Sequence, residues 1–229
     1  VHHSQPRIVT ITQSTENGRV WSAPAIGEFV DHAHAGGLLV HVDGSRIANA
    51  VAALDVSPAE AIADADIVTV GGTKNGMLFG DALLVRRPEH FSGIHFVQKQ
   101  IGHLASKHRF VAAQFLAMLE DGLWLDTARH ANTMARRLST GMTAMGLRLA
   151  SPVEANEVFV HLPADVHRRL APSYAVHQPD PAVPAVRFGC AWSTTESDVD
   201  LSLIHTVRCP PPYAFRSRPS SLLSSTLIT

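Results

Sequence analysis

The segment Leu38–Gly72, which reads LLVHVDGSRIANAVAALDVSPAEAIADADIVTVGG, decides the fold class. It begins and ends with short, nearly continuous apolar runs, Leu38–Val42 and Ile67–Val70. Such runs are typical of strands in a parallel sheet whose two faces are both covered. Between them, Ile47–Leu54 carries apolar residues at helical spacing, and the Ser-Pro pair at 57–58 is typical of a helix start. This strand–helix–strand unit predicts an α/β fold with a parallel-rich sheet.

The flanking sequence extends this unit on both sides. Upstream, we expect a strand at Arg7–Thr12 and a helix at Pro24–Ala35 that ends at two glycines. Downstream, Met77–Val85 predicts one or two further strands. The apolar periodicity of His95–Leu119 then predicts a long helix with a break near Gly102.

The pattern of predicted secondary structure changes near residue 127. We expect a helix at Thr127–Thr143 and then the strand, helix and strand of a small α+β domain at Glu157–Leu162, Ala164–Leu170 and Ala185–Ala191. The chain therefore divides into a large-domain part at 1–126, a small C-terminal domain at 127–205 and a tail at 206–229. The tail is rich in proline and serine and has no acidic residue, which predicts poor order.

Composition excludes several classes of function. The 229 residues are 45% hydrophobic and 17% charged, as in a globular protein, and the net charge of -1 gives no field that would attract nucleic acid or an anionic membrane. No apolar run approaches the ~20 residues that span a bilayer, and the first residues do not resemble a signal peptide. Two cysteines, Cys190 and Cys209, make no disulfide framework, so we expect a cytoplasmic protein.

Histidine is unusually frequent, with fourteen in the chain. Three pairs suggest metal ligands: 2 with 3, 32 with 34, and 103 with 108. None combines i,i+4 helical spacing with a carboxylate partner, so we expect no metal site.

Charged residues follow the two central strands where those strands end. Asp43 and Arg46 come directly after the first, and Lys74 follows the second within Gly71–Gly76. In an open α/β sheet, ligands bind outside the carboxyl ends of the strands, so these side chains are expected on one ligand-binding edge. Pyridoxal phosphate needs a lysine that forms a Schiff base and an aspartate at the pyridine nitrogen. Each motif alone also fits an ordinary turn, and the residues alone leave the two interpretations about equal.

Four motifs resemble one family. HVDGSRIANA at 41–50 is similar to the HxDGAR-x-x-NA segment of threonine aldolases, with Ser45 where alanine is usual. GGTKNG at 71–76, TQSTENG at 12–18, and QKQ through SKHRF at 98–110 also match in order and spacing. Over roughly residues 1–200 the chain resembles the aromatic β-eliminating lyase and threonine aldolase group, and its low-specificity L-threonine aldolases in particular. The resemblance implies the aspartate aminotransferase type of fold, with pyridoxal 5'-phosphate as cofactor.

The resemblance also implies roles for individual residues. Lys74 would form the Schiff base, Asp43 would contact the pyridine nitrogen, and Arg46 would lie near the cofactor's phenolic oxygen or the substrate carboxylate. Arg187 resembles the small-domain arginine that binds the substrate carboxylate, a task that suits a bidentate guanidinium. Lys99 matches a second basic position of the site.

His2 matches a histidine near the substrate hydroxyl, where it would help to remove the proton that starts carbon–carbon cleavage. The implied reaction is retro-aldol cleavage of L-threonine or L-allo-threonine to glycine and acetaldehyde. The implied partners are a small amino-acid substrate and further copies of the chain, as a homodimer or homotetramer.

The chain departs from the family pattern at both ends. After about Asp200 the resemblance predicts that the family's closing helix is lost and that the proline- and serine-rich tail replaces it. Family members begin well upstream of Val1, so the resemblance predicts that an N-terminal portion is missing, with the phosphate-binding loop and a ring-stacking histidine. We therefore expect the isolated chain to be a poor threonine aldolase. Two alternatives stay open: another pyridoxal phosphate-dependent β-lyase or serine hydroxymethyltransferase-like enzyme, and a non-catalytic remnant.

Overall fold

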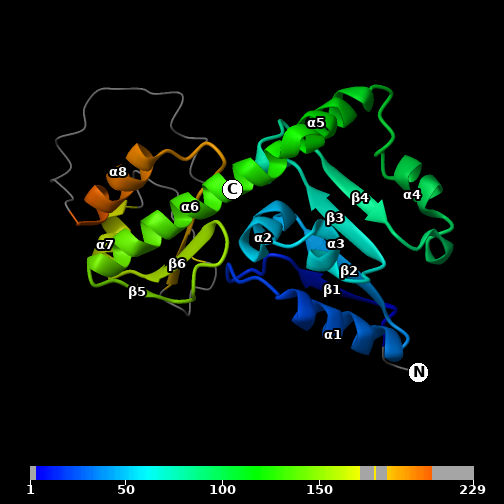
Figure 1. Cartoon of the computed structure of the whole chain (residues 1–229), viewed down its shortest axis with the longest axis horizontal. Helices are drawn as coiled ribbons and strands as arrows, with labels where there is room; N and C mark the ends of the chain where they lie inside the picture. Colours follow the sequence, from blue (N-terminus) through cyan, green and yellow to red (C-terminus); the bar gives the residue numbers. More distant parts are fainter. Residues whose placement is uncertain (1–3, 171–177, 179–184, 208–229) are drawn as a thin grey trace. The chain divides into compact units, whose positions relative to one another are not determined.

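The chain folds as two compact units (Figure 1). The computed structural model describes residues 4–170, 178 and 185–207. The first unit comprises the chain up to Thr15 together with Val20–Asp126, and the second comprises Glu16–Arg19 together with the chain from Thr127 onward. The expected tail beyond Val207 and the proposed site residue His2 lie outside the described residues.

A four-stranded sheet forms the centre of the first unit. Its strands are β1 (Ile8–Thr12), β2 (Leu39–Gly44), β3 (Ile67–Gly71) and β4 (Asp81–Val85), in the order β1-β2-β3-β4. The first three strands are parallel, and β4 pairs antiparallel with β3, as the arrows in Figure 1 show. The expected α/β fold with a parallel-rich sheet is confirmed. Because β4 reverses direction, it returns the chain to the opposite end of the sheet from the carboxyl end of β3.

Three helices pack against one face of this sheet. They are α1 (Ala23–Ala35), α2 (Ile47–Leu54) and α3 (Pro58–Ile62). α1 begins after Ser22, whose side chain accepts a hydrogen bond from the N–H of Ala25, and α3 begins with a capping box. Their apolar side chains form one core with the inward-facing strand residues, and its members include Ile26, Val30, Val40, Val42, Ile47, Val51 and Val68.

The other face of β2 is less covered than its apolar sequence suggests. Its residues alternate along the strand, with Val40 and Val42 buried and with Leu39, His41 and Asp43 half-buried. We expected cover on both faces. The fully buried apolar side chains of β2 are thus those that join the core with α1, α2 and α3, and on the other face Ile67 of β3, which pairs with His41, is buried as well.

The chain leaves the sheet through short helical segments. After β3 comes the one-turn helix η1 (Thr73–Asn75), and after β4 come η2 (Pro88–His90), α4 (Ile94–Gln100), α5 (Arg109–Leu119) and η3 (Glu120–Gly122). The expected helix at 95–119 is thus two helices. Gly102 lies between them at φ +79°, a left-handed conformation that favours glycine.

The second unit contains a small antiparallel sheet of the order β5-β6-β7. Its strands are β5 (Arg148–Leu149), β6 (Glu157–His161) and β7 (Ala185–Gly189). Three helices accompany them: α6 (Leu123–Ala144), within which the two units divide, α7 (Ala164–Leu170) and α8 (Glu196–Val207). Apolar residues of β6, β7, α6 and α8 form its core, including Leu138, Met142, Val158, Val160, Val186 and Val199.

Candidate active site

Asp43 is held at the carboxyl end of β2 by the local backbone. It is half-buried, and its Oδ1 accepts a hydrogen bond of 2.9 Å from the N–H of Ser45. The residue between them is Gly44, where an added Cβ would lie 2.3 Å from the carbonyl oxygen of Thr69 on β3. Only glycine permits this close approach of the two strands. The carboxylate is therefore fixed at the strand ends, where open α/β sheets bind ligands.

Lys74 is held at the same edge by the loop that follows β3. This half-buried lysine lies within η1, and its Nζ donates to the Oγ of Ser45 at 3.4 Å. The loop is fixed on both sides, because Gly72 donates its N–H to Asp81 Oδ1 and the Asn75 side chain donates to the carbonyl oxygen of Trp124. The backbone N–H of Ser45 thus contacts the carboxylate of Asp43, and its hydroxyl contacts the amino group of Lys74.

Arg46 follows Ser45 as the N-cap residue of α2. It is half-buried, and its carbonyl oxygen accepts the N–H groups of Asn49 and Ala50 at 3.0 and 3.2 Å. The turn from β2 into α2 therefore carries three residues of the candidate site, Asp43, Ser45 and Arg46.

Arg187 belongs to the second unit. It lies on β7 opposite Phe159 of β6, and its Nη1 lies 3.5 Å from Oε1 of Glu157. Glu157 is almost fully buried, whereas about a quarter of the Arg187 side chain is exposed. The guanidinium is therefore anchored by a buried carboxylate on the neighbouring strand and still reaches solvent. Glu157 was not singled out from the sequence, because a single acidic residue in an apolar strand has no motif.

The sequence as a whole shows which family the chain belongs to. Residues 1–165 match the family described as beta-eliminating lyase. The chain belongs to the beta-eliminating lyase family. The match covers all strands of the first unit and, in the second unit, extends as far as β6 and the start of α7.

Two curated relatives in this family are similar to the chain. They are low specificity L-threonine aldolases from a Pseudomonas sp. strain and from Pseudomonas aeruginosa, each 38% identical, over 202 and 197 residues. The matches cover 87% and 85% of this chain. The chain spans 58% and 57% of the lengths of these two relatives.

Solved structures place the beta-eliminating lyase chain in a wider fold group. A threonine aldolase from Leishmania major is 26% identical and superposes with a TM-score of 0.83, covering 90% of this chain and 61% of that one. An aspartate aminotransferase from Thermus thermophilus is 17% identical, with a TM-score of 0.66 over 87% of this chain and 56% of that one, which shows the fold alone. The expected aspartate aminotransferase type of fold is confirmed.

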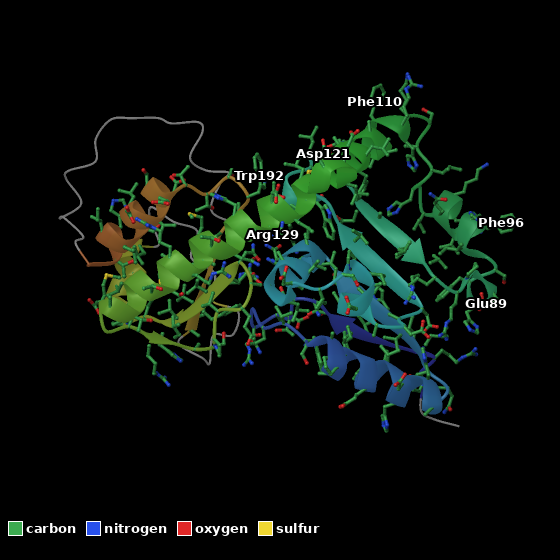
Figure 2. The ribbon with its side chains drawn as sticks, in the orientation of Figure 1. Glu89, Phe96, Phe110, Asp121, Arg129 and Trp192 are labelled. Atoms are coloured by element: carbon green, nitrogen blue, oxygen red, sulfur yellow. The ribbon has the colours of Figure 1, made fainter. Side chains whose placement is uncertain are left out.

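Lys99 belongs to helix α4 of the first unit. It is exposed on α4, which the chain reaches only after antiparallel β4 has run back along the sheet (Figure 1). α4 and α5 also carry large exposed apolar side chains. Figure 2 shows Phe96 of α4 and Phe110 of α5 pointing away from the ribbon, 74% and 57% exposed. This surface of the beta-eliminating lyase chain therefore has the apolar character of a contact site.

The described residues contain neither a cluster of metal ligands nor a membrane-spanning helix. Within residues 4–170, 178 and 185–207, no three His, Cys, Asp or Glu side chains are grouped as metal ligands would be. In the same part of the chain, every helix is too short or too polar to span a bilayer.

Proposed function

We propose that this chain serves an enzyme that uses pyridoxal 5'-phosphate to cleave L-threonine or L-allo-threonine into glycine and acetaldehyde. The observation that carries the proposal is that Asp43 and Lys74 both form a hydrogen bond with Ser45 at the carboxyl edge of the sheet. The names of the Pseudomonas and Leishmania relatives support the choice of substrate.

The residues at this edge fit the cofactor chemically. Pyridoxal phosphate carries an aldehyde that bonds to a lysine amine and a ring nitrogen that is stabilised in its protonated form by a carboxylate. Lys74 would supply the amine and Asp43 the carboxylate, and Arg46 would add positive charge beside them. When bound, the cofactor accepts the electrons of the carbon–carbon bond that breaks.

The chain's own residues then divide the remaining tasks. In retro-aldol cleavage the β-hydroxyl of the substrate loses a proton, the Cα–Cβ bond breaks, acetaldehyde leaves, and Cα gains a proton to give glycine. Arg187 would bind the substrate carboxylate, since a guanidinium held by Glu157 retains further N–H donors for a second carboxylate. Asp43 would keep the ring nitrogen of the cofactor protonated, and that positive charge would offset the negative charge that develops at Cα as the bond breaks.

Two assignments rest on resemblance alone. His2 is proposed as the group that takes the hydroxyl proton, and Lys99 as a second basic residue of the site. We further propose that copies of the chain associate as a homodimer or homotetramer. The exposed apolar side chains of α4 and α5 support this association, because burial of such side chains stabilises an interface.

The test is acetaldehyde release from L-threonine and L-allo-threonine, measured with a coupled NADH-dependent dehydrogenase. We expect release above the level given by free pyridoxal phosphate. Lys74→Ala should return the rate to the free-cofactor level, whereas Lys107→Arg, at an exposed lysine of the same unit, should leave it unchanged. Equal rates for Lys74→Ala and the unsubstituted chain would refute the proposal.

A further inference from the structure

The hydroxyl of Ser45 lies between two strand ends that are fixed relative to each other. The Ser45 N–H donates to Asp43, and Gly71 at the end of β3 approaches the Ser45 backbone so closely that an added Cβ would lie 2.4 Å from the Ser45 carbonyl oxygen. Ser45 is therefore held by β2 on one side and by β3 on the other. Its Oγ is therefore fixed at the carboxyl ends of β2 and β3.

This hydroxyl gives the amino group of Lys74 a partner that an alanine would not provide. A lysine side chain has four rotatable bonds, so its amino group samples many positions unless it is held. At 3.4 Å the contact with Ser45 Oγ is at the long end of the hydrogen-bond range, which predicts a modest effect. A neutral amine that donates one N–H to Ser45 keeps its lone pair available for an aldehyde carbon.

We propose that Ser45 is a positioning residue that holds the amino group of Lys74 at the carboxyl edge of the sheet and thereby directs aldehydes to this lysine. The proposal rests on the proposed function, which assigns Lys74 as the covalent anchor of the cofactor. The threonine aldolase motif that the segment resembles carries alanine at this position, so the contact is a feature of this chain and adds to the roles that the resemblance implies.

The chain offers an internal reference for the test, because it contains only three lysines: Lys74, Lys99 and Lys107. The purified chain is mixed briefly with a limiting amount of pyridoxal phosphate, reduced with borohydride, digested, and analysed by mass spectrometry. The quantity measured is the label on Lys74 divided by the summed label on the two exposed lysines. A general loss of protein lowers both terms in proportion and leaves the ratio unchanged, whereas a loss of positioning lowers the label on Lys74 relative to the label on the other two lysines.

Three variants separate positioning from stability. Ser45→Ala removes the hydroxyl, and Ser45→Thr retains it. Ser57→Ala weakens the N-terminus of α3 in the same unit, where Ser57 and Glu60 form the capping box, and it leaves Lys74 untouched.

We expect the ratio to fall about threefold in Ser45→Ala, the effect of losing a hydrogen bond at the weak end of the usual range. It should stay within about 1.5-fold of the unsubstituted value in Ser45→Thr and Ser57→Ala. An unchanged ratio in Ser45→Ala, or an equal fall in Ser57→Ala, would overturn the positioning role. If the unsubstituted chain is labelled mainly on Lys99 or Lys107, the proposed function fails instead, so the two failures are distinguishable.

Discussion

Substitution of Asp66 by asparagine should destabilise the first unit strongly. Asp66 directly precedes β3 and is fully buried. Its Oδ2 accepts the N–H of Val40 at 2.6 Å and lies 2.9 Å from Nε2 of His34, and its Oδ1 lies 3.3 Å from Nη1 of Arg87. One carboxylate thus joins the end of α1, the start of β2 and the segment after β4.

The magnitude follows from these contacts. Loss of one partner of a buried ion pair costs about 3–5 kcal/mol, and because a third of the Arg87 side chain is exposed, we expect the lower end, roughly 3 kcal/mol. For a chain of this length that corresponds to a fall of roughly 10 °C in the thermal midpoint. Urea unfolding followed by circular dichroism measures the free energy of unfolding directly.

The matched control is Asp64→Asn in the same ion cluster. Asp64 contacts Arg86 and Arg87 but its side chain is 59% exposed, so its loss should cost less than about 1 kcal/mol. Equal destabilisation by the two substitutions would refute the reasoning that burial decides the effect.

The same carboxylate predicts acid sensitivity. Burial raises the pKa of Asp66, but the N–H of Val40, the His34 side chain and the charge of Arg87 lower it more, so the pKa lies below its usual value. The folded pKa is then lower than the unfolded pKa, and the stabilisation is complete above about pH 4 and is lost as pH falls through the folded value. In Asp66→Asn, the free energy of unfolding should therefore fall less steeply as pH is lowered below about 4. An unchanged pH dependence in this variant would contradict the lowered pKa of Asp66.

One further substitution tests the site, and one labelling experiment tests the second unit. Asp43→Asn should abolish most cofactor-dependent acetaldehyde release. The thermal midpoint should change little, because an asparagine Oδ1 can still accept the N–H of Ser45, and near-normal release would refute the role of Asp43. Burial raises the pKa of the Cys190 thiol to about 12. Iodoacetamide at neutral pH should therefore label Cys190 only after denaturant is added, which peptide mass spectrometry measures. Rapid labelling of Cys190 in the folded chain would contradict its burial.

The parallel part of the fold follows from the sequence because the signals are local. Leu38–Val42 and Ile67–Val70 are apolar runs with helical spacing between them, and right-handed parallel connection is the rule for such units. The direction of β4 had no comparable signal. Met77–Val85 was compatible with one or two strands. Its first part is loop, because Gly76 and Gly80, at φ +114° and +117°, allow the chain to turn back before Asp81.

The candidate site was predictable in its charged residues but less so in its contacts. Asp43 and Lys74 stand out because each follows an apolar run in the sequence. That both contact Ser45 depends on how closely β2 and β3 approach each other, and this approach is seen only in the backbone at Gly44 and Gly71. The Arg187 contact with Glu157 depends on the register between β6 and β7, 30 residues apart in the chain, and no local pattern encodes it.

The central claim is that Lys74 binds pyridoxal phosphate covalently. The most direct measurement is to add the cofactor to the purified chain, record the visible absorption band, reduce with borohydride, and map the labelled peptide. We expect a band that reduction removes and a label on Lys74, with little on Lys99 or Lys107. A label distributed evenly over the three lysines, or absent from Lys74, would contradict it.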